Sequence, residues 1–280
     1  ALYYGLDVTD YLARTNFIHP LSCQNFCYTA NAVSVNSEGK DYTQLVRDEL
    51  GLQYDSEKFA RRDETKANEY KAKAIEELTA AGVELPVKMA YYIAGSSQTA
   101  KDTADTFAQL ISDCLGDDLV TLDTRTYVSK LNTEVRDPQL ASIYINGWGA
   151  DFADPVNFLG QETYGDDNAY YSKAYSKINN ATDEKLIATY KEFTELVNTA
   201  KAITDDLDAR YAAFAKAEAY MLQHALVIPW SYEVTWKVTS INEYSKIYTA
   251  YGNQSERYVN WETNSDLYTT EDYEAFKAGK

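Results

Sequence analysis

Histidine is scarce in this chain of 280 residues, and the usual sequence motifs of metal and nucleotide chemistry are missing. The only two histidines, His19 and His224, lie on segments that no sequence pattern brings together. A zinc site or a Ser-His-Asp triad needs histidine among specific partners, and neither arrangement is found. The motifs HExxH, GxxxxGK[ST] and GxGxxG do not occur either. We therefore expect a protein that holds no metal or cofactor and is not an enzyme.

Positive charge is also in short supply. The chain has 26 Lys and Arg against 43 Asp and Glu, a formal net charge of −17. Contacts to nucleic-acid phosphates need Lys or Arg, and no dense basic stripe is present, so a nucleic-acid partner is excluded. The longest apolar runs, such as residues 225–230, are far shorter than the roughly 20 residues of a membrane helix. With 45% hydrophobic residues, the chain can still bury a sizeable core.

The three cysteines do not form a disulfide framework. Cys23 and Cys27 are close enough in sequence to bridge if the loop between them bends suitably, which would fit an oxidising compartment. Cys114 follows a helical apolar stripe and is expected to be a buried thiol, because free cysteine is usually buried. Cysteine usage therefore leaves the compartment open.

Helical and extended patterns alternate along the chain. Apolar spacing predicts helices over residues 1–14, 66–81, 98–115, 126–134 and 206–223. Strands are expected over residues 87–93, 119–122, 140–147, 226–230, 235–238 and 258–261. Between them, residues 15–65 (apart from a short pattern over 42–50) and 150–171 read as irregular. The alternation predicts one mixed α/β (α+β) lobe, in which strand 140–147 is buried and helices 66–81 and 206–223 pack on a sheet.

Tyrosine is unusually frequent, with 25 residues. A tyrosine offers an apolar face and a hydroxyl, a combination that suits recognition of sugars or peptides. The many acids leave open a secreted hydrolase with two carboxylates, whose acids can lie far apart in sequence. No spacing supports that alternative.

The most informative stretch runs over residues 146–159. A predicted strand ends in Gly147-Trp148-Gly149, and two acids, Asp151 and Asp154, then bracket a turn closed by Pro155. Glycines on each side of Trp148 leave backbone groups open to an extended ligand, with Trp148 as a wall and Asp151 as a carboxylate at the end. Asp154, just before a proline, is expected to stabilise the turn. An ordinary strand-to-loop turn with capping acids explains the pattern equally well.

This stretch resembles the signature of the family 5 extracellular solute-binding proteins, the peptide-binding components of ABC importers. The resemblance rests on Gly-Trp-x-Ala-Asp-aromatic-x-Asp-Pro followed by Phe-Leu. Three other stretches resemble family segments in the same order, namely residues 1–7, 72–82 and 210–218 with 226–229. Four stretches in the right order make the resemblance specific.

The resemblance implies a type II periplasmic-binding-protein-like clamp that closes on an extended peptide. It implies that Asp151 pairs with the ligand's α-ammonium group, that Gly147 and Gly149 bond the ligand main chain beside Trp148, and that Tyr127 lines an aromatic pocket. Phe152 departs from the family's common tyrosine. We expect residues 1–280 to be the C-terminal lobe, with the N-terminal lobe absent.

The expected function is that of the extracellular substrate-binding component of an ABC transporter, capturing oligopeptides for import. The expected partners are an oligopeptide and the permease subunits, and the protein would act as a monomer. It would be lipid-anchored at the cell surface or periplasmic. Because one scaffold serves many ligands, a sugar or a nickel complex is the alternative within the family.

Overall fold

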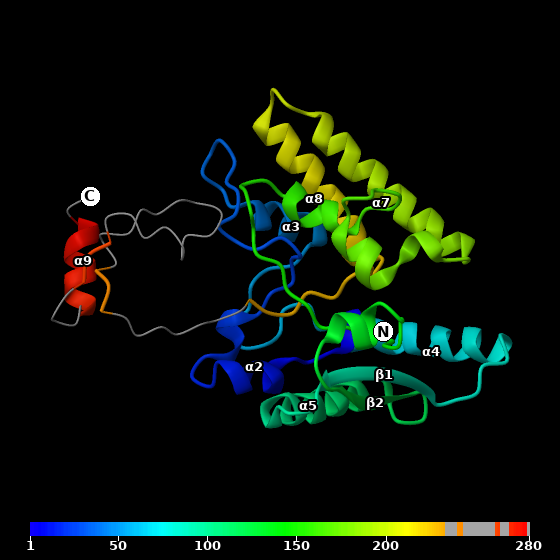
Figure 1. The fold of residues 1–280 in the computed structure, drawn as a ribbon. Helices are drawn as coiled ribbons and strands as arrows, with labels where there is room; N and C mark the ends of the chain where they lie inside the picture. The colour runs from blue at the N-terminus through cyan, green and yellow to red at the C-terminus, as the bar shows by residue number, and fades with distance from the viewer. Residues whose placement is uncertain (233–239, 243–260, 264–268, 279–280) are drawn as a thin grey trace.

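The computed structural model describes residues 1–232, 240–242, 261–263 and 269–278, and it shows a mixed α/β fold (Figure 1). Strands β1 (Val87–Ala94) and β2 (Val120–Tyr127) pair in parallel, with Val87 opposite Val120. They are the only named strands among the described residues. The crossover between them is helix α5 (Gln98–Leu115), as expected for parallel strands.

Helix α5 confirms the helix predicted over residues 98–115. Ser97 caps its start by accepting from the backbone N–H of Ala100, and Gly116, with φ +79°, follows its last residue. Its buried face packs against the sheet and the N-terminal helices (Figure 1). That face consists of Ala104, Phe107, Leu110, Ile111 and Leu115.

A second group of helices lies apart from the sheet. Helix α8 (Leu207–Gln223) packs against α7 (Glu184–Ala202) and α3 (Tyr42–Leu50) (Figure 1). The helix predicted over 206–223 is confirmed, but the expectation that it packs on a sheet is wrong. Its buried residues spread over a broad side of the helix, because both α7 and α3 contact it.

The buried apolar residues form two adjoining clusters. One is built around α3, α7 and α8, and the other around α2, α5 and β2. Helix α1 (Leu2–Gly5) joins them, because Tyr3 lies in the first cluster and Leu2 packs against the second. Ile228 packs against both. The two clusters are therefore parts of one connected body.

The single helix predicted over residues 1–14 is wrong. The segment forms α1 and α2 (Thr9–Thr15), separated by an extended Leu6. Asp7 starts the second helix, because its Oδ1 accepts from the N–H and hydroxyl groups of Thr9. Gly5 lets α1 approach α5 closely, since a Cβ there would lie 2.5 Å from Cys114 Sγ.

Three further predictions need correction or fall outside the described residues. Residues 140–147 are not a buried strand, because they bond β1 only through Ser142 and several of them are exposed. Residues 126–134 are not one helix, because β2 continues to Tyr127 and helix η2 covers Asn132–Arg136. Residues 226–230 are not a strand, because 226 and 227 form a bend and 228–230 are irregular. The strand over 235–238 and most of that over 258–261 lie outside the described residues.

Helix α4 (Glu64–Ala80) and several short helices complete the described chain. Helix α4 confirms the prediction over 66–81, although its contacts are with α1 rather than with the sheet. The remaining elements are η1 (Pro20–Cys23), α6 (Val156–Leu159), η3 (Gly160–Glu162), η4 (Ser172–Ser176), η5 (Ile178–Asn180) and α9 (Thr270–Ala278).

The three cysteines are free thiols. Cys23 and Cys27 are both buried, and Cys114 is half-buried.

Candidate functional site

The stretch leading to Asp151 is an extended segment with open backbone groups. Among the described residues, no backbone N–H from residue 143 to residue 150 donates a hydrogen bond. Gly147 and Gly149 are exposed, and a Cβ at either position would meet no atom within 4 Å. The open backbone inferred from the sequence is thus present, although it belongs to an unpaired segment rather than to the end of a buried strand.

Asn157, at the start of the short helix α6, organises the segment. Its Oδ1 accepts from the Trp148 indole N–H at 3.1 Å and from the Asp151 backbone N–H at 2.9 Å. Its Nδ2 donates to Asp151 Oδ2 at 3.2 Å. Because the Asn157 side chain is buried, it holds Trp148 and Asp151 in a fixed relation. No sequence signal marks this role, since an asparagine two residues after a proline reads as part of a turn.

The two acids of the motif have different environments. Asp151 is exposed, and its only side-chain partner among the described residues is Asn157. Asp154 accepts from the N–H of Val156 and forms a two-bond ion pair with Arg210, at 2.8 and 3.1 Å. The turn-stabilising role predicted for Asp154 is confirmed. Asp151 is therefore the acid that is free to meet a ligand.

Aromatic rings line the segment on one side. The Trp148 ring centroid lies 6.0 Å from that of Tyr170 and 5.8 Å from that of Tyr171. Tyr171 also donates its hydroxyl to the Gly147 carbonyl at 2.6 Å, which fixes the open backbone against the rings. Tyr175 contacts both tyrosines and reaches Tyr144 at 5.1 Å. The tyrosine content pointed to recognition of sugars or peptides, but it predicted neither this cluster nor its members.

Tyr127 is not brought to this cluster. It is the last residue of β2, paired with Ala94 of β1, and its carbonyl accepts from Gly95. Within the described residues, no hydrogen bond or ring contact joins Tyr127 to Trp148 or Asp151. Its proposed pocket role has no support from these contacts.

Glu162 is a buried carboxyl group beneath the site. Its Oε1 accepts from the Tyr28 hydroxyl at 3.0 Å. Burial raises the pKa of Tyr171 and of Tyr190, and the charge of Glu162 contributes to both shifts. Burial raises the pKa of Glu162 to about 7, because the ionised form loses its hydration, while the Tyr28 hydrogen bond opposes the shift. The carboxyl group therefore takes up a proton near neutral pH.

Replacing Glu162 by glutamine is expected to stabilise the protein in alkaline solution. The unfolded carboxyl ionises near pH 4.5 and the folded one near 7, so its contribution is most favourable below pH 4.5 and is lost as the pH rises to 7. The loss amounts to about 3 kcal/mol. Glutamine keeps an acceptor for Tyr28 without charge, so Glu162→Gln should gain about 2 kcal/mol over wild type at pH 8 and almost nothing at pH 4.5.

Urea unfolding of both proteins between pH 4.5 and 8.5 measures this difference. Glu195→Gln, at an exposed position of α7, is the control and should show no such pH dependence. A constant difference between Glu162→Gln and wild type across this range would contradict the assignment.

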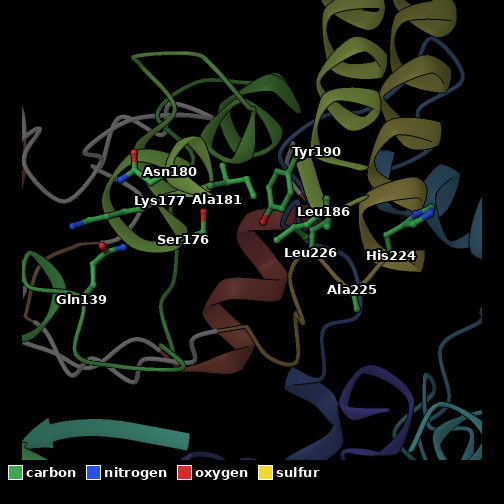
Figure 2. Close-up of a pocket in the computed structure, with 11 residues that line it drawn as sticks. Gln139, Ser176, Lys177, Asn180, Ala181, Leu186, Tyr190, His224, Ala225 and Leu226 are labelled. Atoms are coloured by element: carbon green, nitrogen blue, oxygen red, sulfur yellow. The ribbon is translucent and has the colours of Figure 1, made fainter. Parts of the chain in front are cut away.

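A separate pocket of about 400 Å³ lies between η4, η5 and the facing ends of α7 and α8 (Figure 2). Leu186, Leu226 and Tyr190 gather in one part of it, and Gln139 and Lys177 lie on the other side of Ser176. None of the residues predicted for ligand binding lines this pocket. The pocket is therefore distinct from the segment that ends at Asp151.

The part of the chain that the structure describes offers no candidate metal site and no candidate membrane helix. No cluster of three or more His, Cys, Asp or Glu side chains there could hold a metal ion. No described helix combines the length and the apolar character needed to cross a membrane.

The sequence is similar to known oligopeptide-binding proteins, although no family model matches it. It is 26% identical over 247 residues to the oligopeptide-binding protein SarA of Streptococcus gordonii. It is also 26% identical over 249 residues to the oligopeptide-binding protein AliA of Streptococcus pneumoniae. Both matches cover 82% of this chain, but only 36% and 37% of the relatives, so the chain spans little more than a third of their length. The resemblance drawn from the motifs is confirmed.

Solved structures of peptide-binding proteins share the fold. Haemophilus influenzae OppA, in complex with RPPGFSPFR, matches with a TM-score of 0.56 and 16% identity, over 94% of this chain and 44% of that chain. A peptide-binding protein of a peptide ABC transporter matches with a TM-score of 0.55 and 22% identity, over 81% of this chain and 86% of that chain. The mixed α/β lobe predicted from the sequence is therefore confirmed as a fold of this kind.

Proposed function

We propose that this chain is the C-terminal lobe of the substrate-binding component of an ABC importer, and that it captures oligopeptides. A second, N-terminal lobe would form the other jaw of the clamp. The permease subunits would be its partners, and the protein would act as a monomer outside the cell membrane, lipid-anchored or periplasmic. This is a binding function without turnover.

The observation that carries the proposal is the open backbone of residues 143–150 ending at an exposed acid. An extended peptide can pair its main chain with such a segment whatever its side chains are, as in strand addition to a sheet edge. Asp151, held by Asn157, then offers a carboxylate to the peptide's α-ammonium group. Asp154 cannot compete for that role, because Arg210 already occupies both of its oxygens.

Replacing Asp151 by asparagine is expected to abolish the preference for a free peptide N-terminus. In the full-length protein, wild type should bind a free hexapeptide about 30-fold more tightly than its N-acetylated form, roughly 2 kcal/mol for a charged contact in a closed cleft. In Asp151→Asn that ratio should fall to about threefold, because an amide cannot neutralise the ammonium group. Isothermal titration calorimetry with both peptides measures the ratio.

Asp154→Asn is the matched control, since it makes the same change three residues away. It should lower the stability of the protein, because the ion pair with Arg210 is lost. The ratio of free to acetylated peptide affinity should stay unchanged. If acetylation does not alter binding to wild type, or if Asp151→Asn keeps the wild-type ratio, the role of Asp151 is refuted. A sugar has no terminal ammonium group, so tight binding of a sugar by a protein that binds neither peptide would favour that alternative.

A further inference from the structure

The rings beside the open segment form a surface that the core does not explain. We call Tyr144, Trp148, Tyr170, Tyr171 and Tyr175 the aromatic wall. The ring centroid of each lies between 5.1 and 6.0 Å from that of at least one other. None of the five belongs to either buried apolar cluster. The wall is therefore not simply an extension of the core.

Part of the aromatic wall faces solvent. Tyr170 is 40% exposed, and Phe152, which lies outside the wall but next to Asp151, is 47% exposed. Trp148, Tyr144 and Tyr175 are half-buried, and Tyr171 is buried. A cluster of rings that is partly exposed beside open backbone groups is typical of a ligand surface, because burying it on binding releases water from apolar area.

Arg136 gives the aromatic wall a positive edge. Its guanidinium carbon lies 5.5 Å from the centroid of Tyr175, and its Nη1 donates to the Tyr170 hydroxyl at 3.4 Å. Asp137 pairs with the same guanidinium at 2.9 Å, and the Arg136 side chain is only 15% exposed. The ring faces near Arg136 are thus already engaged by a cation, so a second cation from a ligand gains little there.

The aromatic wall is tied to the path of a bound peptide. Tyr171 holds the Gly147 carbonyl, and Trp148 lies three residues before Asp151. At about 3.3 Å per residue, a stretch of extended peptide roughly 10 Å long spans from Asp151 to Trp148. A peptide whose N-terminus meets Asp151 would therefore pass the wall within its first four residues.

We propose that the aromatic wall is the specificity-determining subsite of the peptide site, and that it takes an aromatic side chain from the first four residues of the ligand. The inference rests on the proposed function. An aromatic side chain of the ligand would gain edge-on and offset contacts with the rings of the wall, whereas an aliphatic side chain would gain only burial. A basic side chain of the ligand would meet the positive charge of Arg136. The ligand class is thus oligopeptides with an aromatic residue near the N-terminus.

A positional scan tests the proposal on the full-length protein. The probes are alanine hexapeptides that carry one Phe, Leu or Lys at each position in turn. We expect Phe at one of the first four positions to bind about tenfold more tightly than Ala, Leu about threefold, and Lys no more tightly than Ala. In Tyr170→Ala the advantage of Phe should fall to about threefold or less, because the exposed ring is lost.

Two variants make the result specific to the aromatic wall. Tyr170→Leu keeps an apolar side chain and should also lose the preference for Phe over Leu. Tyr54→Ala, which removes a tyrosine of similar exposure (53%) outside the wall, should keep the full preference.

The outcomes separate the two proposals. Peptides that bind with the expected sensitivity to acetylation, but without a gain for Phe at the first four positions, would refute the subsite and leave the proposed function standing. Equal gains for Leu and Phe, or a stronger gain for Lys, would refute it as well. If no hexapeptide binds, the proposed function itself is overturned and the subsite with it.

Discussion

Replacing Arg210 by methionine is expected to lower the free energy of unfolding by about 3 kcal/mol, the lower end of the cost of stranding one partner of a buried ion pair, because this pair is partly buried. Arg210 and Asp154 are 17% and 19% exposed, and two hydrogen bonds join them. Arg210 also donates to the carbonyls of Ala200, Lys201 and Ile203 at the end of α7. Methionine fills much of the space but leaves the Asp154 carboxylate and three carbonyls without these donors.

Urea unfolding followed by circular dichroism measures this loss. Lys216→Met, at an exposed position of the same helix, is the control and should change stability by less than about 0.5 kcal/mol. The double variant Arg210→Met with Asp154→Ala should cost less than the sum of the single changes, because no buried charge is then left alone. Additive losses would show that the two side chains do not act as a pair.

Replacing Glu218 by leucine is expected to cost at least about 4 kcal/mol of stability, since several buried donors lose their acceptor. Oε1 of Glu218 accepts from the backbone N–H groups of Tyr28 and Thr29, at 2.7 and 3.1 Å. Oε2 accepts from the hydroxyls of Thr29 and Tyr42, at 2.6 and 3.1 Å. Burial raises the pKa of Glu218, while these four hydrogen bonds favour the ionised form.

Two comparisons distinguish lost hydrogen bonds from lost volume. Glu218→Gln keeps an acceptor for the two N–H groups, and its amide can donate to hydroxyls that rotate to accept, so we expect a loss of only about 1 kcal/mol. Glu195→Leu makes the same change as Glu218→Leu at an exposed position and should be nearly neutral. If the denaturant midpoints of Glu218→Leu and Glu195→Leu coincide, the network does not stabilise the fold.

The structure gives a physical role to residues that carry the sequence resemblance. Arg210 and Glu218 both belong to the stretch over 210–218. One side chain holds the turn at Asp154, and the other holds the loop at Tyr28 and Thr29. Helix α8 thus connects the turn at Asp154 to the helical core. The matched stretches serve the architecture of the lobe as well as any ligand.

The sequence predicts best those helices whose start, buried face and end are all marked by residues within or next to them. Helix α5 was predicted with its observed bounds, because Ser97, the apolar face and Gly116 mark its start, its side and its end. The strand over 140–147 was wrong for the opposite reason. Its isoleucines and tyrosines favour an extended chain, but pairing needs a partner strand, and only Ser142 bonds to β1.

The sequence by itself determined the mixed α/β class, the main helices, the open glycines around Trp148, and the turn role of Asp154 next to a proline. Tertiary structure alone decided what holds these features in place. Asn157 reaches back to Trp148 and Asp151, Arg210 crosses 56 residues to Asp154, and Glu218 crosses 189 residues to Thr29. Hydrophobic periodicity records which face of an element is buried, but it carries no information on which distant polar group will meet it there.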